Sequence, residues 1–366
     1  MRKWILAAIL AASAASAATA QTRHVETVVE GLDYPWAMAF LPDGRLLVTE
    51  KSGDLRVIEA GVLQPEPVSG VPEVLYSGQG GLLDIVLHPD FASNRLVYLT
   101  WSAGETRDNT LKLGRGRLEG NALIGFEEIF AATPRRETDV HYGARLAFLP
   151  DNSILLGIGE GFDFREEAQR PQTHLGSYVH LAGDGTPSPS PFADAAPGVF
   201  SIGHRNPQAI VRDPVTGIVY SNEHGPRGGD EINILTEGGN YGWPIATHGT
   251  DYTGALVTPY TSYPGMIEPI LFWVPSIAPS SMTIYHGAMF PEWDGDLLVT
   301  ALIHGDADVP SGHLRRIDLE GGAVIGQEIL LGDIEARMRD VEVGPDGSIY
   351  VLTDEDNGRL IRLSRD

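Results

Sequence analysis

The chain has 366 residues, 42% of them hydrophobic, no cysteine and a formal net charge of −23 at neutral pH. The lack of cysteine excludes disulfides, thiolate zinc sites and cysteine nucleophiles. The acidic balance argues against binding to nucleic acid or to anionic membrane surfaces, because their phosphates would be repelled. The hydrophobic content is sufficient for a substantial core.

The first twenty residues have the organisation of a secretory signal peptide. Two basic residues open the chain, an apolar stretch follows over residues 4–12, and a small-x-small cleavage site ends at Ala20. The apolar stretch is too short to span a bilayer, so a cleaved segment is favoured over a membrane anchor or a buried first helix. We therefore expect residues 1–20 to be removed and the mature protein, from Gln21, to be periplasmic or secreted, without membrane insertion. Loss of two basic and no acidic residues takes the net charge from −23 to −25.

One phrase recurs six times along the mature chain: a turn rich in Pro, Asp and Gly, a strand of alternating apolar residues, and a polar loop. Its marker prolines lie 47 to 77 residues apart, at Pro42, Pro89, Pro150, Pro214, Pro291 and Pro345. The turns have the chemistry of tight hairpins, and repeats of this size, rich in strand and turn, are typical of β-propellers. We predict an all-β fold, a single six-bladed β-propeller over residues 21–366. A row of small β-sandwiches is the alternative, but no linker separates the copies.

Two strand-like segments at the ends of the mature chain predict how the ring closes. Residues 23–29 are expected to complete the last blade beside residues 359–363. The variable repeat spacing places the long insertions in loops on one face, where a ligand would bind.

Two polar residues lie just before repeated strands and could take part in binding or chemistry. His141 precedes the strand of the third repeat, and Gln79 lies in a glycine-rich loop that enters the second. An imidazole titrates near neutrality, so a positioned histidine is a common proton acceptor for an alcohol. On this residue alone, a structural hydrogen bond to a backbone carbonyl is the favoured interpretation.

Three arginines are candidates for binding an anion. Arg337 and Arg339 precede the sixth repeated strand and, in an extended segment, point to the same side. Two guanidinium groups aimed together suit a ligand with several carboxylates, although exposed arginines usually form surface ion pairs. Arg205 could add a third guanidinium group, and Asn206 could add an amide. Because these residues share one phase of the repeat with Gln79, we expect them to converge on one mouth of the central channel.

The glycine-rich segment 223–244 is suited to a hard cation. Calcium takes about six to eight oxygen ligands, many of which are backbone carbonyls that glycine-rich turns can offer. Gly225 and Pro226 could present carbonyls to the channel, and Glu231 with the Tyr241 carbonyl could form a second, structural site. The alternative is that Asp230 and Glu231 only bind loop amides.

Several strings of this chain together resemble those of a known enzyme family. From about Thr27 to Leu363 the chain is similar to the soluble pyrroloquinoline quinone (PQQ)-dependent aldose sugar dehydrogenases of the glucose/sorbosone dehydrogenase family. The strings are GLDYPWAMAFLPDGRLLVTEKSG, GQGGLLDIVLHPDF, HYGARL, GHRNPQ, GPRGGDEIN, GGNYGWP, FWVPSIAPSSM and RMRDVEVGPDG. The resemblance implies an exported six-bladed propeller that oxidises aldose sugars at C1 to lactones with PQQ and calcium, and passes electrons to an external acceptor.

The resemblance also implies roles for the matched positions. His141 would be the base that removes the proton of the anomeric hydroxyl, and Arg205 would stabilise charge on the quinone oxygen as hydride arrives. The cofactor and its three carboxylates would be held by Gln79, Arg205, Asn206, Arg337 and Arg339. The substrate pocket would be lined by Trp273 and Gln79.

Calcium would have two sites by the same resemblance. The carbonyls of Gly225 and Pro226 would bind the ion that polarises the quinone. A structural site would use Glu231, the Tyr241 carbonyl and Glu268.

The chain departs from the family pattern in its fifth repeat. Some members carry a lysine that reaches the cofactor, and here Ile303 and His304 stand at that place. Loss of this cation would weaken PQQ binding unless His304 or another group replaces it.

Two other classes of function remain open on the same scaffold. One is a calcium-dependent lactonase, which would need a channel calcium held by several side-chain carboxylates and amides. The other is a non-catalytic propeller that binds carbohydrate or protein, since fold alone does not fix function.

Overall fold

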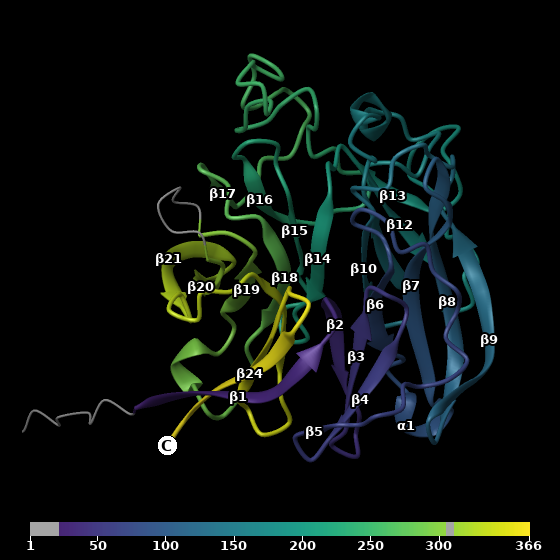
Figure 1. Cartoon of the computed structure of the whole chain (residues 1–366). Helices are drawn as coiled ribbons and strands as arrows, with labels where there is room; N and C mark the ends of the chain where they lie inside the picture. Colours follow the sequence, from purple (N-terminus) through teal and green to yellow (C-terminus); the bar gives the residue numbers. More distant parts are fainter. Residues whose placement is uncertain (1–21, 305–310) are drawn as a thin grey trace, which may run out of the picture.

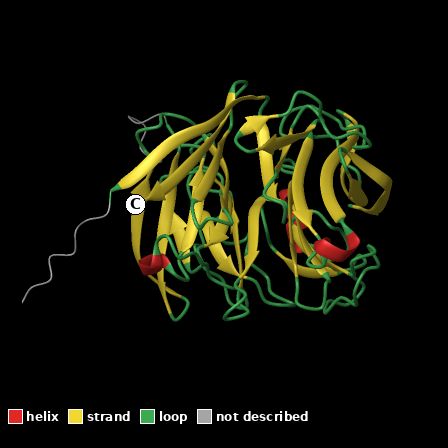
Figure 2. Cartoon of the chain, turned by 90° about the horizontal axis from the view of Figure 1, so that it is seen from below, coloured by secondary structure: helices red, strands yellow, loops and turns green. Residues whose placement is uncertain are grey.

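The computed structural model describes residues 22–304 and 311–366, which form six four-stranded sheets arranged in a ring (Figure 1). Each copy of the repeated phrase makes one sheet, and its turn joins the first two strands of that sheet. Figure 2 shows that nearly all of this part of the chain is strand and loop, with only short helical segments. The predicted all-β, six-bladed propeller is confirmed. The predicted signal peptide lies outside the described residues and stays a prediction.

The blades follow one another in chain order. The first three contain β2 (Pro35–Phe40), β3 (Leu46–Glu50), β4 (Leu55–Glu59) and β5 (Val62–Leu63); β6 (Leu82–Leu87), β7 (Leu96–Glu105), β8 (Asp108–Glu119) and β9 (Ala122–Ala131); β10 (Gly143–Phe148), β11 (Ile154–Ile158), β12 (Ser177–Leu181) and β13 (Val199–Ile202). The fourth and fifth contain β14 (Pro207–Arg212), β15 (Val219–Glu223), β16 (Asp230–Ile234) and β17 (Leu271–Trp273); β18 (Pro279–Ile284), β19 (Leu297–Ala301), β20 (His313–Glu320) and β21 (Ala323–Leu330). The sixth contains β22 (Met338–Val343), β23 (Ile349–Thr353), β24 (Gly358–Arg365) and β1 (Arg23–Leu32). The helical segments are α1 (Phe91–Asn94), η1 (Arg165–Gln169) and η2 (Pro291–Trp293).

The ring closes by pairing the two ends of the described chain. Strand β1 runs antiparallel to β24, from the pair Arg23–Arg365 to the pair Leu32–Gly358 (Figure 1). The closure predicted from the sequence is therefore confirmed. Closing the ring in this way pairs a strand that would otherwise leave its backbone N–H and C=O groups exposed at a sheet edge.

Hydrophobic side chains fill the space between neighbouring blades. At the closure, Met38 and Val48 of the first blade pack against Leu352 and Leu360 of the sixth, all of them nearly inaccessible to solvent. Burial of an aliphatic side chain of this size stabilises the fold by about 1.5–3 kcal/mol. The interfaces between blades therefore hold the ring together.

Each inner strand carries a break in its pairing register near its first residues. The breaks fall between Pro35 and Ala37, Leu82 and Ile85, Gly143 and Leu146, Pro207 and Ala209, Pro279 and Ser281, and Met338 and Asp340. A bulge of this kind redirects the side chain of the extra residue. The repeated bulge thus turns one or two side chains of every blade out of the regular ladder at the same height in the ring.

The guanidinium of Arg145, from one of these bulges, contacts all six blades at the axis. Its Nη1 lies 3.0 Å from Asp84 Oδ1 and its Nη2 lies 2.8 Å from Asp340 Oδ1. The remaining N–H groups donate to backbone carbonyls of Trp36, Gln208 and Ser280, at 3.1 to 3.4 Å. The arginine is 7% exposed, so these are buried interactions.

The long connections lie on one side of the ring. The segments between β11 and β12 and between β16 and β17 meet at the top of Figure 1. They are joined there by an ion pair of 3.5 Å between Arg165 and Asp251. Within residues 22–304 and 311–366, no helix is long and apolar enough to cross a bilayer.

Replacing Arg145 tests the role of the axial guanidinium. Arg145→Met leaves Asp84 and Asp340 buried without their cation, so we expect a loss of about 3–5 kcal/mol in the free energy of unfolding. Urea unfolding followed by circular dichroism measures it. The control is Arg117→Met on the exposed face of β8, whose ion pair with Glu119 should contribute less than about 1 kcal/mol. Equal stability of the two variants would show that the axial contacts are dispensable.

Candidate functional site

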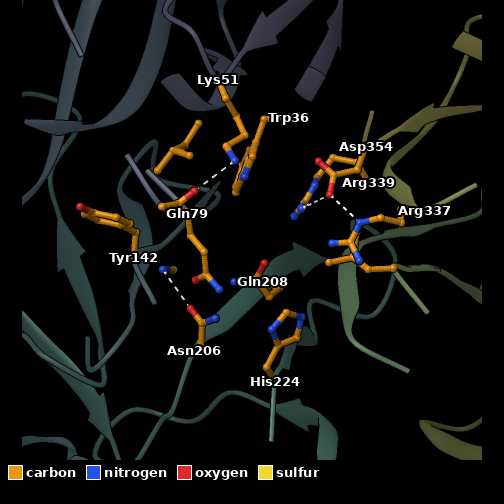
Figure 3. Close-up of a pocket in the computed structure, with 14 residues that line it drawn as sticks. Trp36, Lys51, Gln79, Tyr142, Asn206, Gln208, His224, Arg337, Arg339 and Asp354 are labelled. Carbon is orange, nitrogen blue, oxygen red and sulfur yellow. Dashed lines mark hydrogen bonds and ion pairs between the residues drawn. The ribbon is translucent and has the colours of Figure 1, made fainter. Parts of the chain in front are cut away.

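A cavity of about 250 Å³ opens at the axis and receives residues from all six blades (Figure 3). Its wall is built from residues just before or at the start of an inner strand and from residues just after the second strand of a blade. The lining consists of Trp36, Lys51, Gly78, Gln79, Leu83, Tyr142, Gly143, Asn206, Gln208, His224, Leu302, Arg337, Arg339 and Asp354. Four of these, Trp36, Leu83, Gln208 and Arg339, are bulge residues, so the repeated bulge supplies the floor of the cavity.

Four residues singled out from the sequence meet in this cavity. They are Gln79, Asn206, Arg337 and Arg339. The amides also brace neighbouring blades: Gln79 Oε1 accepts a 2.7 Å hydrogen bond from the backbone N–H of His141, and Asn206 Oδ1 accepts one of 3.3 Å from Gly143. Four of the five residues expected to share one mouth therefore line it, and the fifth, Arg205, does not.

Asp354 holds the two arginines of the sixth blade in place. Its Oδ2 lies 3.1 Å from Arg337 Nε and 2.9 Å from Arg339 Nη2. Burial would raise the pKa of Asp354, but Arg339 and then Arg337 outweigh it and hold the pKa at about 2. One carboxylate shared by two guanidinium groups leaves a net positive charge on this side of the cavity.

His141 lies beside the cavity and is fixed by several contacts. It is 4% exposed, its Nδ1 lies 3.2 Å from Glu160 Oε1, and its carbonyl accepts a 2.8 Å hydrogen bond from Arg136 Nη1. A Cβ at position 159 would lie 2.1 Å from the same carbonyl, so only glycine fits there. Backbone and side chain of His141 are both held in one orientation.

The protonation of this pair is set mainly by burial. Burial, followed by the nearby charges of Arg205 and Arg136, lowers the pKa of His141 well below its usual value. Burial also raises the pKa of Glu160 to about 7, with Arg205 opposing the rise. The imidazole is therefore neutral at neutral pH. When Glu160 is ionised it accepts from Nδ1–H, which leaves the lone pair of Nε2 for a proton.

Arg205 does not line the axial cavity but lies directly next to it. It is 3% exposed, its backbone N–H donates to Glu223 Oε2 at 2.6 Å, and its Nη1 donates to the Gly225 carbonyl at 2.6 Å. Its guanidinium stacks near Trp243 and Tyr252, at 5.2 and 5.9 Å from the ring centres. The arginine is thus grouped with the glycine-rich segment, while the adjacent Asn206 faces the cavity.

Two aromatic rings cover His141 from the loop side. Phe162 meets the imidazole edge-on with 5.2 Å between ring centres, and Tyr252 stacks on Phe162 with 6.1 Å between ring centres. Tyr252 is 57% exposed, so the stack runs from the surface to the buried histidine.

Asp230 binds loop amides, as the alternative interpretation of the acidic pair predicts. Its Oδ1 accepts from Gly225 N–H at 2.9 Å, and its Oδ2 accepts from Ile277 N–H and Ala278 N–H, each at 2.8 Å. Asp230 therefore fixes the turn that carries Gly225.

The predicted calcium ligands are gathered only in part. Glu231 and the Tyr241 region line a small cavity of about 10 Å³ together with Glu223 and Gly225, large enough for one small ion or water. Burial and then the charge of Glu223 raise the pKa of Glu231 well above its usual range. Pro226 is buried and lines neither cavity, and Glu268 is exposed. Among the described residues, no group of three or more His, Cys, Asp or Glu side chains is placed to hold a metal.

Trp273 does not line the axial cavity, and its role in the substrate pocket stays a prediction. It is 6% exposed on the outer strand β17 and packs in the core with Tyr220 and Ile232. Its indole N–H donates to Gln327 Oε1 at 2.9 Å, which joins the fourth blade to the fifth. A tryptophan on the outermost strand faces the neighbouring blade instead of the axis.

Among residues 22–304 and 311–366, the fifth blade contributes no cation to this cavity. Leu302 is its lining residue, while Ile303 is 37% exposed and His304 packs edge-on against His313 with 5.4 Å between ring centres. His304 therefore does not stand in for the family lysine here.

The sequence reasoning missed several polar residues of the site: the cavity is also lined by Lys51, Tyr142, Gln208, His224 and Asp354, and Glu160 contacts His141. A signal for the two acids was present in the repeat itself. In the first, third, fourth and sixth copies an acidic residue lies at the end of the second strand or within two residues after it, at Glu50, Glu160, Glu223 and Asp354. Because this strand ends at the mouth, each acid is placed to orient a neighbouring basic group.

Comparisons with known proteins agree with this geometry. The sequence profile described as glucose/sorbosone dehydrogenase matches residues 32–362. The chain belongs to the glucose/sorbosone dehydrogenase family. It is 38% identical to the aldose sugar dehydrogenase YliI of Escherichia coli over 99% of this chain and 98% of that protein.

Solved structures of the family are also similar. The apo form of the soluble aldose sugar dehydrogenase of Escherichia coli superposes with a TM-score of 0.87 at 38% identity, covering 94% of this chain and 100% of that one. The PQQ-bound aldose sugar dehydrogenase of Streptomyces coelicolor gives a TM-score of 0.74 at 28% identity, covering 94% and 99%.

Asp230→Ala tests whether this carboxylate supports the turn beneath Arg205. The change leaves the buried N–H groups of Gly225 and Ile277 without their acceptor, so we expect a loss of about 3 kcal/mol in the free energy of unfolding. Chemical denaturation measures it, with Glu237→Ala in an exposed turn as the control, expected to stay within about 0.5 kcal/mol of wild type. A loss no larger than that of the control would contradict the supporting role.

Proposed function

We propose that this chain is an exported quinoprotein that oxidises aldose sugars at C1 to lactones. PQQ and calcium would be its cofactors, and an external acceptor would take the electrons. One observation carries the proposal: a cavity with an excess of positive charge adjoins a neutral, buried imidazole. The relatives named as aldose sugar dehydrogenases, one of them PQQ-bound, support it.

The residues of the cavity fit a polyanionic cofactor. PQQ carries three carboxylates, and the cavity presents Lys51, Arg337 and Arg339 against the single carboxylate of Asp354. The Nε of Arg339 is buried and has no acceptor among the described residues. A carboxylate from the cofactor would complete this set with charge-assisted hydrogen bonds.

The acidic residues near the glycine-rich segment fit a cation. Glu231 and Glu223 are buried close together, and burial, followed by the charge of Glu223, raises the pKa of Glu231 well above its usual range. A calcium ion would favour the ionised form. We propose that Glu231 and the Tyr241 carbonyl, with Glu268, hold a structural calcium, and that the Gly225 and Pro226 carbonyls face the calcium of the channel. That second role needs Arg205 to release the Gly225 carbonyl.

The described side chains suggest how the reaction would be assisted. When bound, the quinone supplies the acceptor for the electron pair and hydrogen that leave C1. Nε2 of His141 would take the proton of the C1 hydroxyl, so that the sugar becomes the lactone. Glu160 at Nδ1 would stabilise the resulting imidazolium, as the carboxylate does in a hydrolase triad. Arg205 would balance negative charge that develops near it.

The same geometry favours a dehydrogenase over a lactonase. A lactonase of this fold would need a channel calcium held by several side-chain carboxylates, and such a cluster does not occur in the part of the chain that the structure describes. The wall of the axial cavity instead has one carboxylate and three cations.

Reconstitution and one substitution test the proposal. Purified protein given PQQ and calcium should reduce a dye only when an aldose is added, and chelation of calcium should abolish this activity. His141→Ala should lower kcat by about 10²–10⁴-fold, because a general base contributes that much. PQQ binding, followed by absorbance, should change little. The control is His24→Ala on an exposed edge. Full activity of His141→Ala, or no activity of wild type with any common aldose, would refute the proposal.

The pH profile tests the role of Glu160. With its pKa at about 7, ionisation of Glu160 should make kcat/KM rise as the pH increases through neutrality. Glu160→Gln keeps the shape but carries no charge at any pH, so this rise should disappear and activity should fall by about 10- to 100-fold. Glu237→Gln, an exposed matched change, should keep the wild-type profile. An unchanged rise in Glu160→Gln would assign the titration to another group.

A further inference from the structure

Lys51 is a basic residue of the axial cavity that lies in the first of the family strings but was given no role in the sequence analysis. It follows directly after β3, is partly buried, and reaches the cavity from the first blade (Figure 3). Its Nζ lies 5.9 Å from the ring centre of Tyr34 and 5.6 Å from that of Tyr76, and it donates to the Gly78 carbonyl at 3.5 Å. These weak contacts hold the ammonium at the mouth and leave donors available.

Lys51 also lacks the partner that most basic residues of this acidic chain have. Among residues 22–304 and 311–366, no carboxylate forms an ion pair with its Nζ, whereas Lys112 on β8 pairs with Glu128 at 2.7 Å. The cavity contains one carboxylate, Asp354, and that group is already shared by Arg337 and Arg339. The wall therefore has a formal excess of two positive charges.

The three cations influence one another across the cavity. Burial lowers the pKa of Lys51, and Arg339 and Arg337 lower it further against the opposing effect of Asp354. In Figure 3 the ammonium approaches from the side of Gln79 and the two guanidinium groups from the other side of the cavity. Like charges held around one space without enough counter-charge indicate a site for a polyanion.

We propose that Lys51 is the third cofactor-binding cation of this cavity, contacting one carboxylate of PQQ from the first blade while Arg337 and Arg339 contact the others. This inference rests on the proposed function. It gives the three carboxylates of the ligand three cationic partners, although the described part of the fifth blade lines the cavity with Leu302 alone. Lys51 is in this role a determinant of affinity and not a participant in the chemistry.

Equilibrium binding of PQQ tests the assignment without any turnover. Apoprotein is titrated with PQQ in the presence of calcium, and binding is followed by quenching of tryptophan fluorescence, since Trp36 lines the cavity. Lys51→Gln should raise Kd by about 10- to 100-fold, the range for loss of a charge-assisted hydrogen bond. Lys51→Arg should restore binding to within about threefold. The Kd of Lys51→Gln should also depend less on salt than that of wild type, because one charge pair is gone.

A matched lysine and an uncharged ligand provide the controls. Lys112→Gln, on the outer part of the second blade, should bind PQQ like wild type. The trimethyl ester of PQQ lacks the negative charges, so it should bind wild type and Lys51→Gln with similar Kd. Thermal unfolding of Lys51→Gln should match that of wild type, which separates lost binding from lost folding.

The possible results separate this inference from the function on which it rests. If wild type binds PQQ and Lys51→Gln binds it within twofold, the role of Lys51 is refuted and the proposed function stands. If Lys51→Arg fails to restore binding while it folds normally, the effect is not one of charge and the assignment is equally refuted. If wild type does not bind PQQ at all, the proposed function fails and the inference fails with it.

Discussion

A single buried guanidinium at the axis, that of Arg145, is the interaction on which the site depends. Asp84 and Asp340 neutralise it, and carbonyls of Trp36, Gln208 and Ser280 accept its other N–H groups. Trp36 and Gln208 also form part of the cavity wall. The same group therefore fixes the inner strands relative to one another and sets the positions from which the ligand-facing side chains project.

Much of the fold was predictable because the sequence repeats a local signal. Six hairpin turns with alternating strands require six blades, and the strand-like residues at the two ends indicate the closure. Convergence of Gln79, Asn206, Arg337 and Arg339 follows from the same argument, since equivalent positions of a ring point to one axis. The position of a residue within the repeat thus predicts whether its side chain points toward the axis, although it does not predict the distances between such side chains.

Other parts of the site were not predictable, for physical reasons. The bulge that turns Arg339 and Gln208 toward the axis leaves no distinctive residue type in the sequence. Lys51 carries meaning only once the structure places it opposite the arginines. The surroundings of Trp273 depend on its position on the outermost strand of the fourth blade, and the sequence does not show which strand of a blade a residue occupies within a long insertion.

The cavity wall at the axis has the opposite sign of charge to the protein as a whole. The chain as a whole is strongly acidic, yet the cavity wall has three cations and one carboxylate. Beside this wall, burial keeps His141 neutral, and burial raises the pKa of the neighbouring Glu160 to about 7. The protein can therefore attract an anion into the mouth without charging the imidazole next to it.

The acids at the ends of the second strands of four blades show which part of this fold can be altered. Each one is buried at the end of its strand and contacts different groups: Asp33 and Arg56 for Glu50, His141 for Glu160, His204 for Glu223, and an arginine pair for Asp354. The acid and the residue that it binds can be replaced together, while the hydrophobic packing of the blade is retained. The same ring of blades can therefore carry different polar residues at its mouth, and a change in one blade can alter specificity without a change in the others.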